Sequence, residues 1–348
     1  DLISRKVRDG TYKFTPYREK LIPRGAQRPP RQLSVPTIRD RLTLRAICNA
    51  IKEVIPAANV AAPHTYIRAC SRAIAEAREN SSFLRMDIKD YYPSIPHAAL
   101  LEKLAANGLP AEVVAVIREA ISTVTGDRKV PGKTVGVPQG LSISNALSAV
   151  YLADFDTEMN DLGFYRRYVD DILFIVPSEK VRSVYKSAFL ALEKRGLVSH
   201  PLDTKDKTEE FRLDQGVQYL GYILKPNMIS IRKASFDRMF RNLFRILTNI
   251  KYKKLSDRDI WKLNLKITGC IVNGTRRGWL MFFGQTENMK QLKHLDKFLD
   301  VQIEKLGHNR HGVGVKYFVK SYYEIKFRLV GSRYIPNFDA MSLSDRID

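Results

Sequence analysis

The stretch Tyr168-Val169-Asp170-Asp171 lies between residues 164–167 and the apolar run 172–176. Neither glycine nor proline interrupts these flanks, so the pattern predicts two strands joined by a tight turn that carries both acids. Adjacent carboxylates repel each other and are costly to desolvate unless a cation neutralises them. Mg²⁺ is a natural partner, because it binds one or two carboxylates together with substrate phosphates. A solvated Asp-Asp turn is the alternative that this stretch alone leaves open.

Two further stretches carry groups that suit the same chemistry. Asp87 is a third acid on a predicted strand, residues 83–88, and one sheet could bring the three carboxylates together. Two-metal phosphoryl transfer uses such a cluster. Residues 136–144 (Gly-Val-Pro-Gln-Gly-Leu-Ser-Ile-Ser) predict a fixed loop that leads into a helix. A helix N-terminus suits a phosphate or a base edge, although an ordinary turn is the alternative here.

The composition favours a nucleic-acid partner. The 348 residues are 44% hydrophobic, enough for two or three subdomains, and the formal net charge is +21. Such a charge favours nucleic acid first and an acidic membrane surface second. No apolar run is long enough to predict a membrane span. The three widely spaced cysteines indicate free thiols in a reducing compartment, and the start of the chain shows no apolar signal region, so we expect a cytoplasmic protein.

Hydrophobic periodicity predicts the remaining elements. Strand 83–88 alternates apolar and polar residues, which predicts one face on a core. The proline-rich, basic segment 22–31 predicts an extended or looped arm, with an ordered strand at Leu33 and Val35. Helices are predicted over residues 37–55, 64–79, 97–106, 110–122, 142–160, 179–195 and from 234 onward, and a hairpin over 218–231.

In combination, these stretches resemble the reverse transcriptase family. The segment Asp87-Ile-Lys-Asp-Tyr-Tyr, the loop 136–144 and Tyr-Val-Asp-Asp are similar to three of its motifs, in the family's order. Residues 31–41, Lys207-Thr208 and Tyr219-Leu-Gly-Tyr are similar to its fingers motif, its lysine motif and its primer-grip hairpin. The six motifs span about residues 31–225.

The resemblance implies an α+β chain with the right-hand polymerase fold. Residues 1–82 would form fingers with a basic N-terminal arm. Residues 83–230 would form a palm, an antiparallel sheet backed by helices, with a fingers insertion near 110–135 and the primer-grip hairpin at 218–231. Residues 231–348 would form a basic helical thumb and C-terminal region.

The resemblance also implies roles in chemistry. Asp87 and Asp170 would be the principal ligands of two Mg²⁺ ions, with Mn²⁺ as a substitute. Asp171 would be a weaker third ligand, and Ile88 would offer its backbone carbonyl. Lys207 would be the acid that protonates pyrophosphate, with Lys205 as a rival.

Further residues would bind nucleotide or nucleic acid. Tyr92 stands at the family's steric-gate position, where an aromatic ring collides with a ribose 2′-OH, and an ordinary core tyrosine is the alternative. The remaining nucleotide-binding candidates are Arg31, Pro138 and Gln139. The nucleic-acid-binding candidates are Arg24, Arg28, Tyr219, Gly221, Arg241 and Arg245.

Two bacterial groups of the family resemble the chain. Residues 265–283 resemble the defence-associated (unknown-group) reverse transcriptases, which act against phage and copy a partner non-coding RNA. Ile267-Thr268-Gly269 is close to the Val-Thr-Gly signature of retron enzymes, which make branched RNA–DNA, but retrons usually carry Tyr-Ala-Asp-Asp where this chain has Val169. The chain shows no RNase H acidic cluster and no His-Asn-His pattern, which argues against a retroviral or mobile-intron protein.

The expected function is therefore RNA-directed DNA synthesis from dNTPs on a dedicated structured non-coding RNA, in antiphage defence. The expected partners are that RNA, the DNA product, and a second copy or an accessory protein, with no membrane. A catalytically silent RNA-binding scaffold is one competing hypothesis, and the three costly acids count against it. An RNA polymerase or terminal transferase is another, and Tyr92 counts against ribonucleotides.

Overall fold

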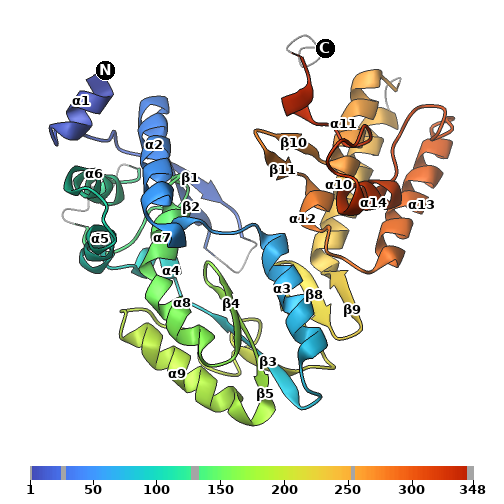
Figure 1. Ribbon diagram of the computed structural model, residues 1–348. Coiled ribbons are helices and arrows are strands. Elements are labelled where there is room, and N and C mark those ends of the chain that lie inside the picture. Colours follow the sequence, from blue (N-terminus) through green and yellow to red (C-terminus); the bar gives the residue numbers. More distant parts are fainter. Residues whose placement is uncertain (1, 25–28, 127–132, 252–254, 343–348) are drawn as a thin grey trace. The chain divides into compact units, whose positions relative to one another are not determined.

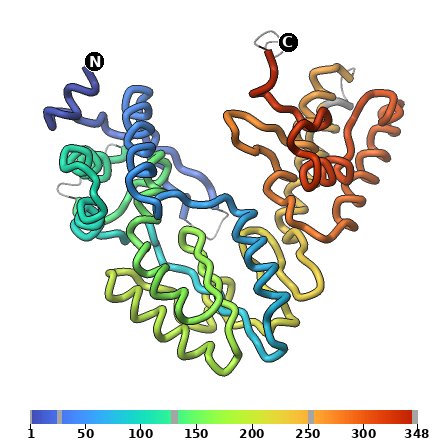
Figure 2. Tube along the Cα trace, viewed as in Figure 1, coloured from blue at the N-terminus to red at the C-terminus, as the bar shows by residue number. Residues whose placement is uncertain are grey.

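Helices and strands alternate along the chain in a computed structural model that describes residues 2–24, 29–126, 133–251 and 255–342. The chain divides into two units, one of residues 1–61 with 80–211 and the other of residues 62–79 with 212–348. The chain leaves the first unit after residue 61 and returns to it at residue 80. Figure 2 traces the chain from its N-terminus to its C-terminus. The boundaries of fingers, palm and thumb given above remain predictions.

The first unit contains a four-stranded sheet, and Asp87, Asp170 and Asp171 lie at one end of it. Its strands are β3 (Ser81–Asp87), β4 (Phe164–Tyr168), β5 (Asp171–Pro177) and β6 (Glu209–Arg212), in the order β4-β5-β3-β6 (Figure 1). β5 pairs antiparallel with both β3 and β4, and its register sets Asp171 opposite Asp87 and Tyr168. The predicted hairpin is confirmed, and its turn lies at the same end of the sheet as Asp87.

Both faces of the two central strands, β3 and β5, are buried. The prediction that residues 83–88 face a core on one side only is wrong, because the neighbours Phe83 and Leu84 are each 0% exposed. Leu84 and Phe174 belong to the main hydrophobic core, which also includes residues of α8 (Ala153–Asn160) and α9 (Val181–Glu193). Burial on both faces explains why 172–176 is a continuous apolar run.

The helices predicted over 37–55, 97–106, 110–122 and 179–195 are confirmed as α2 (Ile38–Val54), α5 (His97–Ala106), α6 (Ala111–Ser122) and α9. A single helix over 142–160 is wrong. The chain leaves helical geometry at Leu152 (φ −105°, ψ 16°), between α7 (Ser144–Tyr151) and α8. Asp154 and Asp156 stand in the first turn of α8, where negative charge stabilises a new helix start.

The N-terminal segment is more regular than its composition predicts. It begins with the helix α1 (Leu2–Arg8), which was not predicted. The strands β1 (Arg18–Ile22) and β2 (Arg31–Val35) then pair antiparallel, so the strand expected at Leu33 and Val35 is confirmed. The backbone N–H of Ser34 in β2 donates to the carbonyl of Gln139 at 2.7 Å. This bond attaches the β1–β2 hairpin to the loop before α7.

A buried carboxylate ties this segment to α2. Asp40 is 0% exposed and accepts hydrogen bonds from the Tyr12 hydroxyl (2.8 Å), the Thr37 hydroxyl (2.8 Å), the Thr15 backbone N–H (3.1 Å) and the Arg39 guanidinium. Burial alone would raise the pKa of Asp40, but these donors outweigh it and hold the pKa below its ordinary value.

The second unit combines α3 (Pro63–Glu76) with the C-terminal half of the chain. Its sheet of β7 (Val217–Tyr219), β8 (Tyr222–Lys225) and β9 (Met228–Ile231) confirms the hairpin predicted over 218–231. The predicted helix 64–79 is confirmed as α3, and the one predicted from 234 as α10. The remaining elements are α10 (Lys233–Lys251), α11 (Asp257–Thr268), β10 (Cys270–Val272), β11 (Thr275–Arg277), α12 (Trp279–Phe282), α13 (Met289–Lys305) and α14 (Phe318–Phe327).

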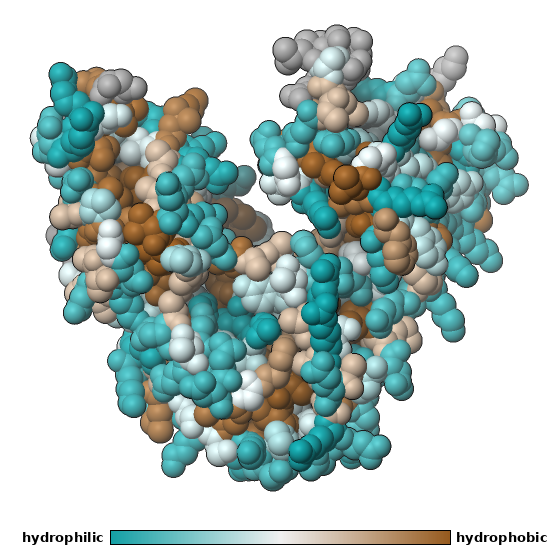
Figure 3. Space-filling model, in the orientation of Figure 1, coloured by the Kyte–Doolittle hydropathy of each residue, from teal (hydrophilic) through white to brown (hydrophobic). Residues whose placement is uncertain are grey.

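The surface combines hydrophilic regions with exposed apolar side chains. Figure 3 shows hydrophilic side chains over much of the face in view, with apolar side chains gathered in separate patches. Exposed apolar side chains occur on α2, at Ile38 and Leu42, and near the end of α14, at Phe327 and Val330. Among the residues that the structure describes, no helix has the length and apolar character needed to cross a membrane.

Replacing Asp40 with alanine should lower the free energy of unfolding by about 3 kcal/mol, because Tyr12 and the Thr15 N–H lose a buried partner. Urea unfolding at pH 7 measures this loss. Glu53→Ala, at an exposed position of the same helix, is the matched control. Because the folded pKa of Asp40 is lowered, its contribution is present above the unfolded pKa and disappears as pH falls through the folded one. Equal midpoints for the two variants would contradict the anchoring role.

Candidate active site

The structure brings Asp87, Asp170 and Asp171 together at one end of the sheet. Asp87 ends β3, Asp170 lies in the turn between β4 and β5, and Asp171 begins β5 directly opposite Asp87. The Ile88 backbone N–H donates to the carbonyl of Asp170 at 3.1 Å, which joins the strand end to the turn. Asp87, which stands more than 80 positions before the other two acids, therefore shares one local environment with them.

Burial and mutual repulsion act on these acids. Burial raises the pKa of Asp171 to about 6, Arg85 opposes that rise, and the charges of Asp170 and Asp87 add to it. The pKa of Asp170 is also raised, by burial first and then by the charge of Asp87. Arg31 and Lys207 lower it, so both cations lie close enough to act on the cluster. Perturbed carboxylates of this kind are typical of functional sites.

Two of the three carboxylates have a cationic partner. The Arg85 Nε lies 3.1 Å from the Asp171 Oδ1, and the Lys207 Nζ lies 2.6 Å from the Asp87 Oδ2. The His200 Nε2 is 3.3 Å from the same Asp87 oxygen, and the His200 backbone N–H donates to the Asp87 carbonyl. Asp170, in contrast, forms no ion pair with a described residue.

Sequence reasoning missed Arg85 and His200. Arg85 stands two positions before Asp87 on the same strand, and residues two apart in a strand share a face. Its pairing with Asp171 could therefore have been anticipated from the strand period. Nothing in the sequence around His200 indicated its position, because a loop brings it to Asp87. Lys205, the rival of Lys207, forms no ion pair with any residue that the structure describes.

The donor set fits a hard divalent ion. Asp87 and Asp170 offer oxygen ligands whose mutual repulsion a cation would relieve, and the carbonyl of Ile88 accepts a hydrogen bond from no residue in the described part of the chain. The Asp171 carboxylate is engaged by Arg85. Within residues 2–24, 29–126, 133–251 and 255–342, however, no three His, Cys, Asp or Glu side chains are arranged as a ready metal site. Asp87 and Asp170 are therefore the residues that would hold such an ion.

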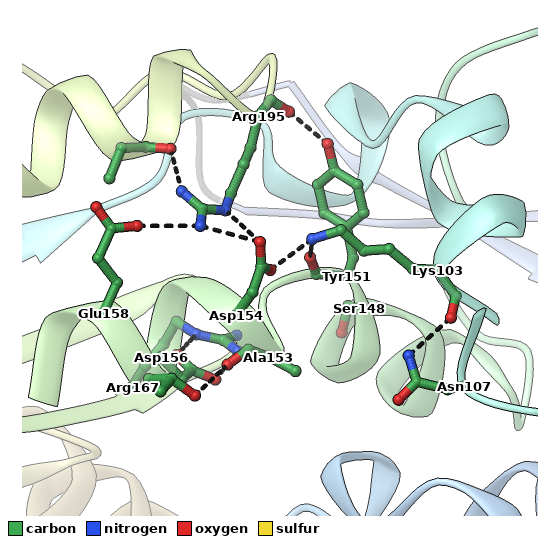
Figure 4. Close-up of polar contacts among 12 residues, drawn as sticks. Lys103, Asn107, Ser148, Tyr151, Ala153, Asp154, Asp156, Glu158, Arg167 and Arg195 are labelled. Carbon is green, nitrogen blue, oxygen red and sulfur yellow. Dashed lines mark hydrogen bonds and ion pairs between the residues drawn. The ribbon is translucent and has the colours of Figure 1, made fainter.

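The turn that carries Asp170 is strained and tightly held. Val169 has φ +60°, a left-handed conformation that β-branched residues rarely adopt. The Arg167 Nη1 donates to the Val169 carbonyl at 2.9 Å. The Arg167 side chain is only 5% exposed and makes two bonds to Asp156 of α8, at 2.7 and 2.6 Å (Figure 4). The Tyr165 hydroxyl donates to the same carboxylate, so α8 fixes the turn through Arg167.

A second acid of α8 forms ion pairs with residues outside that helix. Asp154 accepts from the Lys103 Nζ at 2.5 Å and from the Arg195 Nη2 at 2.9 Å, and Arg195 also reaches Glu158 at 3.1 Å (Figure 4). The Tyr151 hydroxyl donates to the Arg195 carbonyl. Asp154 therefore joins α8 to α5 and to the end of α9. Its side chain is 54% exposed, so these pairs stabilise the fold weakly.

The loop 136–144 packs against Tyr92. Gly136 has φ +95°, and a Cβ there would lie 2.8 Å from the Pro93 carbonyl, so the position requires glycine. The Val137 N–H donates to the Tyr92 carbonyl at 2.8 Å. The Pro138 carbonyl accepts from the Ser144 hydroxyl at 2.6 Å. The loop thus has a fixed conformation, as predicted, between the β1–β2 hairpin and the short helix α4 (Tyr91–Ser94).

The other predicted residues are not gathered at the acids by any contact. Arg24 is exposed, and Arg28 lies outside the described residues. Tyr219 and Gly221 belong to the second unit, where Tyr219 is 1% exposed and Gly221 has φ +81°. Their binding roles stay predictions, as do those of the exposed residues Arg241 and Arg245 on α10.

Asp156→Ala should lower the free energy of unfolding by about 3 kcal/mol, because it leaves the buried Arg167 guanidinium without its partner. Asp154→Ala is the matched control on the same helix, and we expect a loss of about 1 kcal/mol or less from its exposed pairs. Thermal unfolding of the two variants gives the comparison. A larger loss for Asp154→Ala would contradict the assignment of Arg167 as the anchor of the turn.

In the metal-free protein, Asp171 should lose its proton at about pH 6. The folded pKa lies above the unfolded one, so this group stabilises the fold at low pH, and its contribution is lost as pH rises through about 6. Carboxyl carbon NMR of labelled aspartates follows the titration, and Asp171→Asn identifies the signal. Arg85→Leu should raise the midpoint, and added Mg²⁺ should lower it. A midpoint unmoved by Mg²⁺ would show that no ion binds near these acids.

Comparisons with known proteins bear on the family and the fold of the chain. The family profile described as reverse transcriptase (RNA-dependent DNA polymerase) matches residues 22–224. A relative described as an uncharacterized 91 kDa protein in the cob intron of Schizosaccharomyces pombe is 29% identical over 174 residues. That alignment covers 47% of this chain and 21% of the relative, so the chain spans about a fifth of the relative's length.

Among solved structures, the telomerase of Candida albicans with a TWJ fragment of telomeric RNA superposes with a TM-score of 0.54 at 12% identity. The superposition covers 93% of this chain and 62% of the telomerase chain. Apo telomerase from Candida tropicalis superposes with a TM-score of 0.48 at 15% identity. This superposition covers 90% of this chain and 62% of the telomerase chain. The predicted α+β, right-hand polymerase fold is confirmed by the first of these. Since the family profile spans more than half of its residues, the chain belongs to the reverse transcriptase family of RNA-directed DNA polymerases.

Proposed function

We propose that the cluster of Asp87, Asp170 and Asp171 is the catalytic centre for adding dNTPs to a primer on an RNA template. The observation that carries the proposal is the convergence of the three acids at one end of the sheet. Two divalent ions, Mg²⁺ or in its place Mn²⁺, would activate the primer 3′ hydroxyl and neutralise the leaving pyrophosphate. Asp87 and Asp170 would hold them, with the Ile88 carbonyl as a further ligand.

The cations around the acids have separate tasks in this proposal. Arg85 holds Asp171, which makes Asp171 the weaker ligand. Lys207 reaches the place where phosphate oxygens would approach Asp87, so its ammonium could protonate the pyrophosphate. Arg31, whose charge acts on Asp170, would pair with the triphosphate. Pro138 and Gln139 would border the nascent base pair, because their loop bonds to both the β1–β2 hairpin and α4.

Tyr92 would select deoxyribonucleotides. Its hydroxyl lies near Asp170, since the charge of Asp170 adds to the burial that raises the pKa of Tyr92. A ring in that position would collide with a ribose 2′-OH and leave a 2′-deoxyribose free. The ring also packs on Tyr91, with centroids 5.7 Å apart, so the gate has a rigid neighbour.

We propose a dedicated structured RNA as the template. The net charge of +21 favours a folded polyanion, and the exposed arginines Arg238, Arg241 and Arg245 on α10 would follow a duplex backbone. The complex of the Candida albicans telomerase with an RNA fragment supports RNA binding by this fold. Arg24, Arg28 and the Tyr219–Gly221 turn would add contacts to the primer and template.

Three settings compete for this activity. Antiphage defence by a bacterial, cytoplasmic enzyme, with an accessory protein or a second copy, rests on the resemblance of residues 265–283 to the defence-associated group. A retron enzyme would instead leave DNA joined to RNA by a branch. The similarity to a protein encoded in a cob intron favours a third setting, in which the template is the chain's own intron RNA. We propose the first and design the experiment to separate all three.

Purification of the chain from its native host, followed by sequencing of the nucleic acid that accompanies it, tests the proposal. We expect one dominant structured RNA, with complementary DNA in the wild type and none in Asp87→Asn or Asp170→Asn. Both variants should still bind the RNA, because neither acid contributes positive charge. Branched DNA would assign the chain to the retrons, and intron RNA to the third setting. Equal DNA in wild type and variants would overturn the site, and mixed RNA without DNA would favour the scaffold.

A further inference from the structure

Tyr92 is held at both ends by different parts of the first unit. Its backbone carbonyl accepts from the Val137 N–H at 2.8 Å, and its hydroxyl donates to the Asn145 Oδ1 at 2.6 Å. Asn145 is the second residue of α7, and its side chain is exposed. The same helix carries Ser148, which also contacts the Tyr92 hydroxyl. The ring is therefore fixed at its root by the loop and at its tip by α7.

The bond between Tyr92 and Asn145 is not needed to join α4 to α7. The neighbouring Tyr91 hydroxyl donates to the Ser148 carbonyl at 2.5 Å, and this bond is buried. A buried hydrogen bond of that kind fastens the two helices already, whereas an exposed one contributes little to stability. The Asn145 amide thus acts mainly on the orientation of one ring, and the charge of Asp170 acts on the hydroxyl of that ring.

A steric gate excludes a 2′-OH only as firmly as its ring resists displacement. Rotation about the first side-chain torsion of tyrosine swings the whole ring, so a ring without a tether at its tip could move aside and admit a ribonucleotide. A hydrogen bond at the ring tip makes that swing unfavourable, because the swing must break the bond. The strength of the gate then depends on the residue that accepts the bond as well as on the ring.

We propose that Asn145 is a specificity-determining residue, which holds the Tyr92 ring in place and thereby sets the discrimination between dNTPs and rNTPs. The inference rests on the proposed role of Tyr92 as the gate. It adds a positioning residue from α7 that the sequence motifs did not indicate. Asn145 acts through the Tyr92 hydroxyl, so removal of the Asn145 amide should have no effect in a chain that already lacks this hydroxyl.

The test uses the full chain, Mg²⁺, and a DNA primer annealed to an RNA template whose next base is guanine. The measured quantity is the ratio of kcat/KM for dCTP to that for CTP. For Asn145→Ala we expect this ratio to fall about three- to tenfold, the factor that one hydrogen bond contributes, through faster use of CTP. Tyr92→Phe, which also removes the contact with Ser148, should show at least the same fall, and the double variant should show no further fall than Tyr92→Phe. Tyr92→Ala, which removes the ring, should show a larger fall.

Asn107→Ala is the matched control. Asn107 is also an exposed asparagine of the first unit, and its side-chain amide bonds to the Lys103 carbonyl at 2.8 Å. The ratio of kcat/KM for dCTP to that for CTP should be the same in Asn107→Ala as in the wild type. Equal losses for dCTP and CTP in Asn145→Ala, or effects of Asn145→Ala and Tyr92→Phe that add in full, would overturn the inference. An unchanged ratio in Tyr92→Ala would overturn the gate itself, whereas a change there with none in Asn145→Ala would reject Asn145 alone.

Discussion

Repulsion among Asp87, Asp170 and Asp171 is the constraint on which the site depends. Three carboxylates crowded at one sheet end need compensating charge, and the fold supplies it unevenly. Arg85 forms an ion pair with Asp171, and Lys207 forms one with Asp87, while Asp170 forms no ion pair with a described residue. A divalent cation beside Asp170 would supply the compensating charge that these ion pairs do not provide. The uneven pairing also separates the acids by role, because Asp171 is already engaged from its own sheet.

The strained turn is the second requirement, and α8 meets it. Val169 adopts a left-handed conformation that its branched side chain disfavours, so another part of the structure must hold it. Arg167 does so through the Val169 carbonyl, and Asp156 fixes Arg167 in turn. The break between α7 and α8 matters for this reason, since it starts a new helix whose first turn carries Asp156. One helix thus positions the turn that carries Asp170 and, through Asp154, the end of α9.

The part of the candidate site that we propose for the nucleotide depends on a different set of backbone bonds. The loop 136–144 bonds to β2 through Gln139, to α4 through Val137 and back to itself through Ser144. A Cβ on Gly140 would lie 3.0 Å from the Ser34 carbonyl, so the loop and the β1–β2 hairpin approach closely at that residue. These contacts set Arg31 and Tyr92 on either side of one loop. A substrate bound there would lie near the Arg31 guanidinium, the Tyr92 ring and the acids, and the backbone bonds would fix the relative positions of these groups.

The sequence by itself determined the hairpin, the third acid, the loop and the order of the motifs, because strand period, turn residues and family-like spacing are local properties. The helices over 37–55 and 110–122 followed from periodicity in the same way. Only the tertiary structure decided that both faces of β3 are buried, that the helix breaks at Leu152, and that His200, Asp156 and Asn145 support the candidate site. Each of these depends on residues distant in sequence, whose contacts no local pattern encodes.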